Sequence, residues 1–112
     1  MRKFLLLLAV SAVAIFAQAP AGGGPKNLQV LKPAEVRAGM GGAVAGLGVT
    51  CVECHVAGDN SLDDKPSKLI ARKMFAMTAQ INAGFPDGKA HVSCYTCHRG
   101  QKQPLMAAPA AQ

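Results

Sequence analysis

Aromatic residues are scarce in this sequence of 112 residues, which contains no Trp, one Tyr and four Phe. A small chain buries a limited fraction of its surface, and large aromatic side chains usually supply much of its core. The composition therefore disfavours a domain that is held together by its own side chains alone. A large apolar cofactor would fill this gap, so the sequence indicates a prosthetic group before any motif is considered.

Two further patterns are missing. No stretch alternates apolar and polar residues at a period of two, so we expect no β-strands. The net charge is +6, but the Lys and Arg residues form no dense stripe with interleaved aromatic residues, which is the pattern of a nucleic-acid surface. We therefore expect no nucleic-acid partner.

The N-terminus has the pattern of a secretory signal peptide. Met1-Arg2-Lys3 is a short positive start, and an uncharged apolar run follows from Phe4 to Phe16. This run is short for a membrane span, and Ala17 is the best cleavage position. We expect residues 1–17 to be removed on export, which would lower the net charge to +4. An uncleaved N-terminal anchor is the alternative.

The remaining chain divides by composition into three parts. A segment rich in Ala, Gly and Pro predicts a flexible leader over 18–27, and an Ala- and Pro-rich end predicts a disordered tail over 104–112. Between them, residues 28–103 are enough for one small domain.

Two segments of this domain are predicted to be helical. In the first, Pro33 suits the first turn and Glu35 favours the N-terminus. Apolar residues then recur at helical spacing, at Val36, Met40, Val44 and Leu47. Three glycines, Gly39, Gly41 and Gly42, weaken this helix. Either a flat ring lies close against it, or the helix is broken.

The second helix is expected to begin at Pro66-Ser67 and to stop at Gly84. Its apolar stripe consists of Ile70, Met74, Met77 and Ile81, while Lys68, Arg72 and Gln80 face elsewhere. Polar, turn-rich segments on either side, 57–65 and 82–89, read as loops.

Two Cys-x-x-Cys-His motifs carry the chemistry, at Cys51–His55 and at Cys94–His98. This is the attachment pattern of c-type haem. Two thiols one turn apart, Cys51 with Cys54 and Cys94 with Cys97, can form thioethers with the two vinyl groups of one porphyrin. The adjacent His55 or His98 then supplies the proximal imidazole to the iron.

Other uses of paired cysteines explain less of the pattern. A structural module with a tetrahedral zinc site would leave the adjacent histidines without a role, and so would a set of disulfides. A thioredoxin-like redox pair requires a βαβ pattern that is missing here, and iron–sulfur clusters usually have more closely spaced cysteines. The haem interpretation uses all four cysteines and agrees with export, since thioether attachment takes place outside the cytoplasm.

The distal ligands are less defined by the sequence. Met40 lies eleven positions before Cys51 on the apolar face of its helix, so its sulfur could reach the first iron. In the second helix, Met74 and Met77 share one stripe and the spacing does not separate them. Met residues in helices are also ordinary core residues. His91 is either a surface residue or a ligand to the other haem.

With these residues in view, the sequence resembles the cytochrome c subunit family of photosynthetic reaction centres. Two strings, Ala71-Arg72-Lys73-Met74 and Cys94-Tyr95-Thr96-Cys97-His98-Arg99-Gly100, carry most of the resemblance. In that family a helix before each attachment motif supplies an axial Met. The resemblance therefore implies Met40 for the first haem and Met74 for the second. The family subunit carries four haems, so this chain resembles one two-haem half. The family also uses a His in the loop after the second helix as a ligand to a distant haem. His91 lies in that loop, but nearer to the cysteines than the family pattern places this His.

The expectation is thus an all-α, loop-rich cytochrome c in which a helix–loop–CxxCH unit occurs twice in pseudo-twofold repeat. It would carry two covalently bound haem c groups and transfer single electrons between redox partners in the periplasm. Its partners would be a reaction centre or respiratory components, met through transient contacts, with membrane association through a partner or an uncleaved signal. The alternative is a small peroxidase-like haem enzyme with one open iron position.

Overall fold

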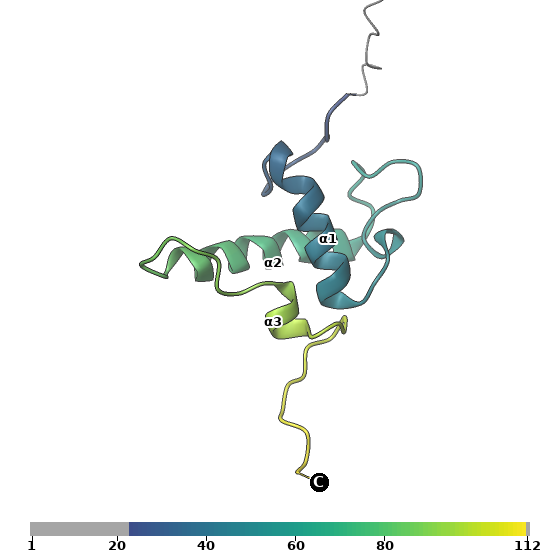
Figure 1. Cartoon of the computed structure of the whole chain (residues 1–112). Coiled ribbons are helices and arrows are strands. Elements are labelled where there is room, and N and C mark those ends of the chain that lie inside the picture. The colour runs from purple at the N-terminus through teal and green to yellow at the C-terminus, as the bar shows by residue number, and fades with distance from the viewer. Residues whose placement is uncertain (1–22, 112) are drawn as a thin grey trace, which may run out of the picture.

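The computed structural model describes residues 23–111, so the predicted signal peptide lies outside the described residues. Figure 1 shows the order of the elements, which are the short 3-10 helix η1 (Pro33–Glu35), α1 (Val36–Leu47), the 3-10 helix η2 (Cys51–Glu53), α2 (Pro66–Ala83) and α3 (Cys94–His98). Residues 23–111 contain no strand, only one isolated bridge between Val56 and Asp59. The prediction of a helical, loop-rich chain is confirmed.

Helix α1 begins close to where the sequence predicts it. Pro33 opens η1, and the carboxylate of Glu35 accepts a 2.9 Å hydrogen bond from the backbone N–H of Lys32. This contact satisfies one of the amides that every helix start leaves unpaired. The helix ends at Gly48, which is left-handed with φ 64° and donates its N–H to the Val44 carbonyl.

Helix α2 has the predicted bounds. Pro66 occupies the first turn, where its missing N–H costs nothing. The last helical residue is Ala83, and the backbone N–H of Gly84 closes the helix by bonding to the carbonyl of Ile81. The long loop that follows, 84–93, leads directly into α3.

The C-terminal end of α1 packs against α3, and this is the closest contact between two helices in the described chain. At its centre is Gly46, which is buried. A Cβ on Gly46 would lie 2.5 Å from the Cβ of Cys94 and 2.8 Å from the backbone nitrogen of Tyr95. Only glycine allows the two backbones to approach this closely.

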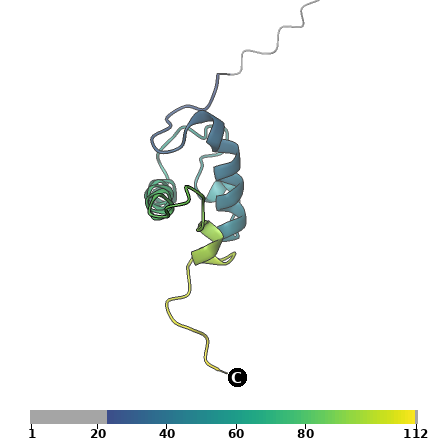
Figure 2. The same ribbon diagram turned by 60° about the vertical axis from the view of Figure 1, so that its left-hand side comes forward.

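Helix α2 runs across α1 rather than beside it, as the two views in Figures 1 and 2 show. They approach at Gly39, where a Cβ would lie 3.4 Å from the ring of Phe75. The side chain of Leu31, a residue that precedes η1, also lies close to Gly39. The chain after α3 extends away from the helices (Figure 1).

The described residues bury no apolar side chain completely. Many of the large apolar residues are instead well exposed, among them the α2 residues Leu69, Ile70, Met74, Met77 and Ile81. Among the described residues, the apolar side chains therefore form no closed core. This agrees with the scarcity of aromatic residues and with a fold that is completed by a prosthetic group.

The glycines of α1 do not break it, since the helix is continuous over Val36–Leu47. Close approach explains Gly39 and Gly46, whereas a Cβ on Gly41 or Gly42 would meet no other atom within 4 Å. Among residues 23–111, no helix combines the length and the apolar character needed to cross a membrane.

Candidate functional site

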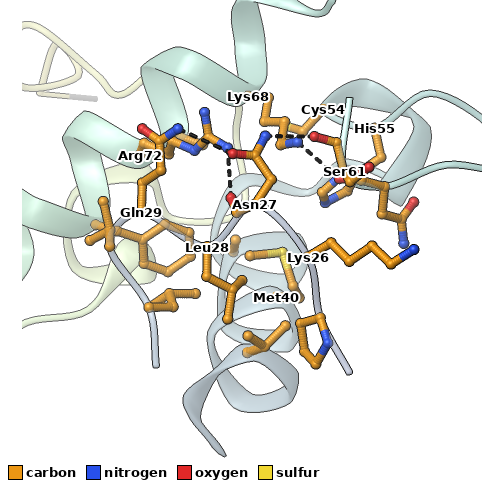
Figure 3. A pocket seen from close by; sticks show the side chains of 18 residues that line it. Lys26, Asn27, Leu28, Gln29, Met40, Cys54, His55, Ser61, Lys68 and Arg72 are labelled. Atoms are coloured by element: carbon orange, nitrogen blue, oxygen red, sulfur yellow. Dashed lines mark hydrogen bonds between the residues drawn. The ribbon is translucent and has the colours of Figure 1, made fainter. Parts of the chain in front are cut away.

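A cavity of about 330 Å³ opens between the N-terminal segment, α1, the first Cys-x-x-Cys-His motif and α2 (Figure 3). Three of the residues singled out from the sequence line it: Met40 from α1, and Cys54 and His55 from the motif. Apolar side chains cover much of the remaining wall, including Leu28, Val30, Leu31, Val36 and Phe75. The cavity therefore offers a thioether sulfur and an imidazole inside an apolar wall.

The first motif folds as a tight turn. Thr50 is extended, Cys51–Glu53 form η2, and the backbone N–H of His55 bonds to the carbonyl of Cys51 at 3.0 Å. Cys51 is exposed and does not line the cavity, whereas Cys54 does. Partial burial, reinforced by the charge of Glu53, raises the pKa of the Cys54 thiol.

His55 is held by one ring nitrogen. Its Nδ1 lies 3.1 Å from the carbonyl oxygen of Asn60. Because a carbonyl only accepts hydrogen bonds, Nδ1 carries a proton, and in the neutral form of the ring the lone pair is then on Nε2. This is the tautomer that a metal ligand requires when it binds through Nε2.

The second motif forms the helix α3. Ser93 precedes it in an extended conformation and exchanges hydrogen bonds with Thr96, while Arg99 ends it in the left-handed region with φ 52°. Nδ1 of His98 lies 3.0 Å from the carbonyl oxygen of Gln101 and 3.1 Å from that of Lys102. The second His is therefore in the same tautomer as the first, although the two motifs have different backbone conformations.

The remaining predicted residues, Cys94, Cys97, His98 and Met74, do not line this cavity. Met74 and Met77 both lie exposed on α2, with 38% and 44% of their surface accessible. Of the residues predicted for the first haem, the structure therefore brings Met40, Cys54 and His55 to one cavity, whereas Cys51 is exposed. It does not decide between Met74 and Met77, so the preference for Met74 still rests on the family resemblance alone.

Charged residues of α2 occupy the opposite side of that helix. Lys68 is buried, at 8% exposure, and it lines the cavity together with Arg72. The carboxylate of Asp63 pairs with Lys68 at 3.0 Å and with Arg72 at 2.9 Å. Hydrogen bonds from Arg72, Lys68 and Asn27 hold the pKa of Asp63 well below its usual range.

Asn27 ties the segment before α1 into this network. Its side-chain amide donates to the Ser61 carbonyl at 2.7 Å and to Asp63 at 3.0 Å, and its own carbonyl accepts from Arg72 at 3.1 Å. Asn27 has φ 58°, a left-handed conformation that Asn tolerates better than most residues. The network closes one wall of the cavity.

An ion pair links Glu53, which lies in the first motif, to Lys102, which follows the second motif. Hydrogen bonds from Lys102 and from Ser67, with the charge of Lys102, lower the pKa of Glu53. The ammonium of Lys65 in turn bonds to the carbonyl of Val52. The polar side chain inside the first motif is thus used to fix the motif rather than to contact a ligand.

His91 lies at the surface, where its ring contacts two neighbouring side chains. Its Nε2 donates to the Asp87 carboxylate at 2.8 Å, and its ring packs on Phe85 with centroids 4.2 Å apart. The backbone N–H groups of His91 and Val92 both donate to the side-chain oxygen of Asn82. Of the two possibilities left open by the sequence, these contacts agree with the surface residue.

All four cysteines are free thiols in the structure. Over residues 23–111, no three His, Cys, Asp or Glu side chains gather in an arrangement that could hold a metal ion. The four thiols therefore do not form the tetrahedral cluster that the zinc alternative requires.

Sequence reasoning missed Lys68, Asn60 and Asn27. An amphipathic helix predicts that its apolar stripe is buried, but α2 buries Lys68 and exposes Met77 and Ile81. The only available signal was compositional, since the turn-rich segment 57–65 offers carbonyl and carboxylate groups to a nearby cation.

Comparison with known proteins identifies the family. The family model of the photosynthetic reaction centre cytochrome C subunit matches residues 27–108. A relative with that name from Thermochromatium tepidum is 42% identical over 62 residues, which are 51% of this chain and 15% of the relative. Cytochrome c-554 of Chloroflexus aurantiacus is 36% identical over 81 residues, 64% of this chain and 20% of the relative.

A further relative has a name that does not mention a reaction centre. The C-type polyheme cytochrome OmcB of Geobacter sulfurreducens is 32% identical over 102 residues, which are 91% of this chain and 12% of that protein. No solved structure was found to match the chain significantly. The chain spans no more than a fifth of the length of any of these three relatives. Since the family model matches most of the chain, the protein belongs to the photosynthetic reaction centre cytochrome c subunit family, whose members are electron carriers of the cytochrome c type.

Proposed function

We propose that the protein carries two covalently bound haem c groups and transfers single electrons between redox partners. The proposal rests on one observation above all, namely that Met40, Cys54 and His55 line the same cavity. These residues come from two different elements, α1 and the first motif, and the surface of the cavity they share is largely apolar. A neutral sulfur and a neutral nitrogen are a donor pair that suits a haem iron.

At the first site, Cys51 and Cys54 would form the thioethers, with His55 and Met40 as axial ligands. The hydrogen bond from His55 to the Asn60 carbonyl supports this assignment, because it orients the ring and leaves Nε2 available.

At the second site, Cys94 and Cys97 would form the thioethers and His98 would be the proximal ligand. The bonds from His98 to the carbonyls of Gln101 and Lys102 repeat the arrangement of the first site. Met74 is the proposed distal ligand. The exposed apolar stripe of α2 supports a group seated against that helix, since such a stripe is unfavourable in water.

Bound haem supplies a one-electron couple, and the chain determines its surroundings. If His55 with Met40 and His98 with Met74 were the ligands of the two irons, no coordination position would be left for a substrate, so the protein would act as a carrier rather than as an enzyme. His/Met ligation also favours a higher reduction potential than ligation by two histidines. The apolar residues of the cavity wall would limit the contact of a bound haem with water at the first site.

Charged residues of the cavity are proposed to pair with the haem propionates. Each haem brings two propionate carboxylates, and these need cationic partners where water is limited. Arg72 and Lys26 line the cavity. The guanidinium of Arg72 has more N–H donors than its contacts with Asp63 and Asn27 use, so it is the residue we propose for a propionate.

Export and transient docking complete the proposal. We propose cleavage of the signal peptide near Ala17, a folded domain over 28–103 to which Asn27 is tied by its hydrogen bonds, flexible segments beyond, and a role in the periplasm. The redox partner would be a photosynthetic reaction centre or a respiratory component. Basic residues around the second site suit a docking rim. Of these, Lys89 and Arg99 are exposed, whereas Lys102 is paired with Glu53.

The test is purification of the exported protein followed by measurement of haem by mass and by absorbance. We expect a mass increase of two haems that survives denaturation, and a reversible one-electron step at each. Replacing Cys51 and Cys54 by Ser, or Cys94 and Cys97 by Ser, should each remove one haem. One haem or none in the wild type would overturn the proposal.

Exogenous ligands separate a carrier from an enzyme. Cyanide or azide should bind the ferric protein slowly or not at all, since both axial positions are filled. Rapid binding at either iron would favour the peroxidase-like alternative.

A further inference from the structure

Lys68 is the one charged or polar side chain that is buried among the described residues, at 8% exposure. It lies on α2, on the side that faces the cavity rather than on the apolar stripe. Burial of an ammonium group is costly unless the group is paired and fully hydrogen-bonded. A position of this kind therefore requires specific partners.

The partners are all groups of the chain itself. Nζ of Lys68 lies 2.9 Å from the carbonyl oxygen of Asn60, 2.6 Å from that of Leu62, and 3.0 Å from the Asp63 carboxylate. An ammonium has three N–H donors, so these contacts use all of them. Lys68 has no donor left for a haem propionate or for a docking partner.

One of these contacts leads to the proposed iron ligand. The Asn60 carbonyl oxygen that accepts from Lys68 also accepts from Nδ1 of His55, at 3.1 Å. Figure 3 shows Lys68 and His55 on the same side of the cavity. A positive charge is thus placed two hydrogen bonds from the imidazole ring.

The local charge is not cancelled. Asp63 is shared between Lys68 and Arg72, so one carboxylate is divided between two cations and does not fully neutralise Lys68. Such a charge acts more strongly in a partly buried site than in open water. It favours the reduced, less positive form of a nearby iron.

The shared carbonyl acts in the same direction. When an ammonium bonds to the Asn60 oxygen, that oxygen draws less strongly on the Nδ1 proton of His55. The imidazole is then a weaker electron donor to the metal, and outer hydrogen bonds of this kind are known to tune bound metals. Both effects raise the reduction potential.

We propose that Lys68 is a positioning residue that raises the reduction potential of the haem on His55 through the Asn60 carbonyl. The inference rests on the proposed attachment of a haem at Cys51 and Cys54. The second site lacks this device, because Nδ1 of His98 bonds to the carbonyls of Gln101 and Lys102, and the ammonium of Lys102 pairs with Glu53 instead. The two haems are therefore set apart in potential.

The experiment is a potentiometric titration of the purified, fully loaded protein and of its Lys68→Met variant. One of the two midpoints should fall by at least the equivalent of a tenfold change in the reduction equilibrium, about 59 mV for one electron. The other midpoint should stay. Lys68→Arg, which keeps the charge, should restore most of the shift, and Lys32→Met, which removes an exposed cation, should move neither midpoint.

The Asp63→Asn variant should shift the midpoint potential in the opposite direction and so gives an independent test. It removes the anion and leaves Lys68 and Arg72 uncompensated, so the same midpoint should rise. This variant decides the question if Lys68→Met fails to load haem. Unchanged midpoints in both variants, or a shift of the same sign in both, would overturn the inference. Absence of haem from the wild type would instead overturn the proposed function, so the two failures are distinguishable.

Discussion

The carbonyl oxygen of Gly46 in the last turn of α1 accepts a 2.8 Å hydrogen bond from the backbone N–H of Gly100, just beyond α3. This bond joins the helix that precedes the first Cys-x-x-Cys-His motif to the segment that follows the second. Gly48 lies against the same segment, since a Cβ there would collide with the Gly100 carbonyl. The two halves of the chain therefore meet backbone to backbone.

Gly46→Ala should destabilise the protein. The new methyl group would meet the Cβ of Cys94 at 2.5 Å and the Tyr95 nitrogen at 2.8 Å, so α3 must shift away from α1. Overpacking of this kind costs about 1–3 kcal/mol. Gly42→Ala is the matched control, because a Cβ there meets nothing, and it should stabilise α1 by roughly 1 kcal/mol. Thermal unfolding of both variants measures the difference, and equal effects would contradict the close contact.

Replacement of the two α2 methionines separates the ligand from its neighbour. Met74→Leu should remove the Met–iron charge-transfer band of one haem, because Leu has no sulfur donor. Met77→Leu, on the same exposed stripe, should leave the bands of both haems intact. Absorbance spectra of the oxidised variants measure this. Loss of a band in Met77→Leu instead would show that the resemblance assigned the wrong residue.

The pair between Glu53 and Lys102 should make stability depend on acid pH. Because the pKa of Glu53 is lowered in the folded protein, its contribution is present above the unfolded value of about 4.3 and is lost as pH falls through the folded pKa. Glu53→Gln should therefore be less stable than the wild type at pH 7, and the difference should shrink towards pH 3.

Denaturant titrations across this range provide the measurement. Asp64→Asn serves as the control, since it removes one charge from an exposed position in the loop between η2 and α2. A Glu53→Gln penalty that is constant with pH would argue against the ion pair.

Asn82 should be required to hold the loop before α3. Its side-chain oxygen accepts from the N–H groups of His91 and Val92 at 2.8 and 2.9 Å, and its amide donates to the Val92 carbonyl at 2.9 Å. Asn82→Ala leaves these groups without partners, at a cost of about 1–3 kcal/mol if water does not replace them. Hydrogen exchange at His91 and Val92 should accelerate, and the exposed Gln80→Ala should not change it.

Local signals were sufficient for the two predicted helices, α1 and α2, but not for the short helix α3 that the second motif forms. Pro66 and Gly84 fixed the ends of α2 because both act through their own backbone chemistry, which needs no distant partner. Pro33 and Glu35 did the same for the start of α1. The repeated order of helix, connection and motif followed from these signals, together with the two cysteine pairs.

The burial of side chains could not be predicted in the same way. Hydrophobic periodicity assumes that apolar side chains pack on other side chains, but no apolar side chain of the described residues is fully buried in this way. The stripe of Met74 and Met77 is consequently exposed, while Lys68 is buried by carbonyl groups from a loop of no regular structure. Only tertiary structure brings these carbonyl groups to the helix.

A chain whose described part has no sealed apolar interior cannot rely on its own contacts to resist unfolding. Anything that binds only the folded state stabilises it by mass action, and a covalent group cannot be lost by dilution. If the proposed haem groups are attached, we therefore expect the polypeptide to be more vulnerable to proteases before attachment than after it, and the level of the loaded protein to follow the supply of haem.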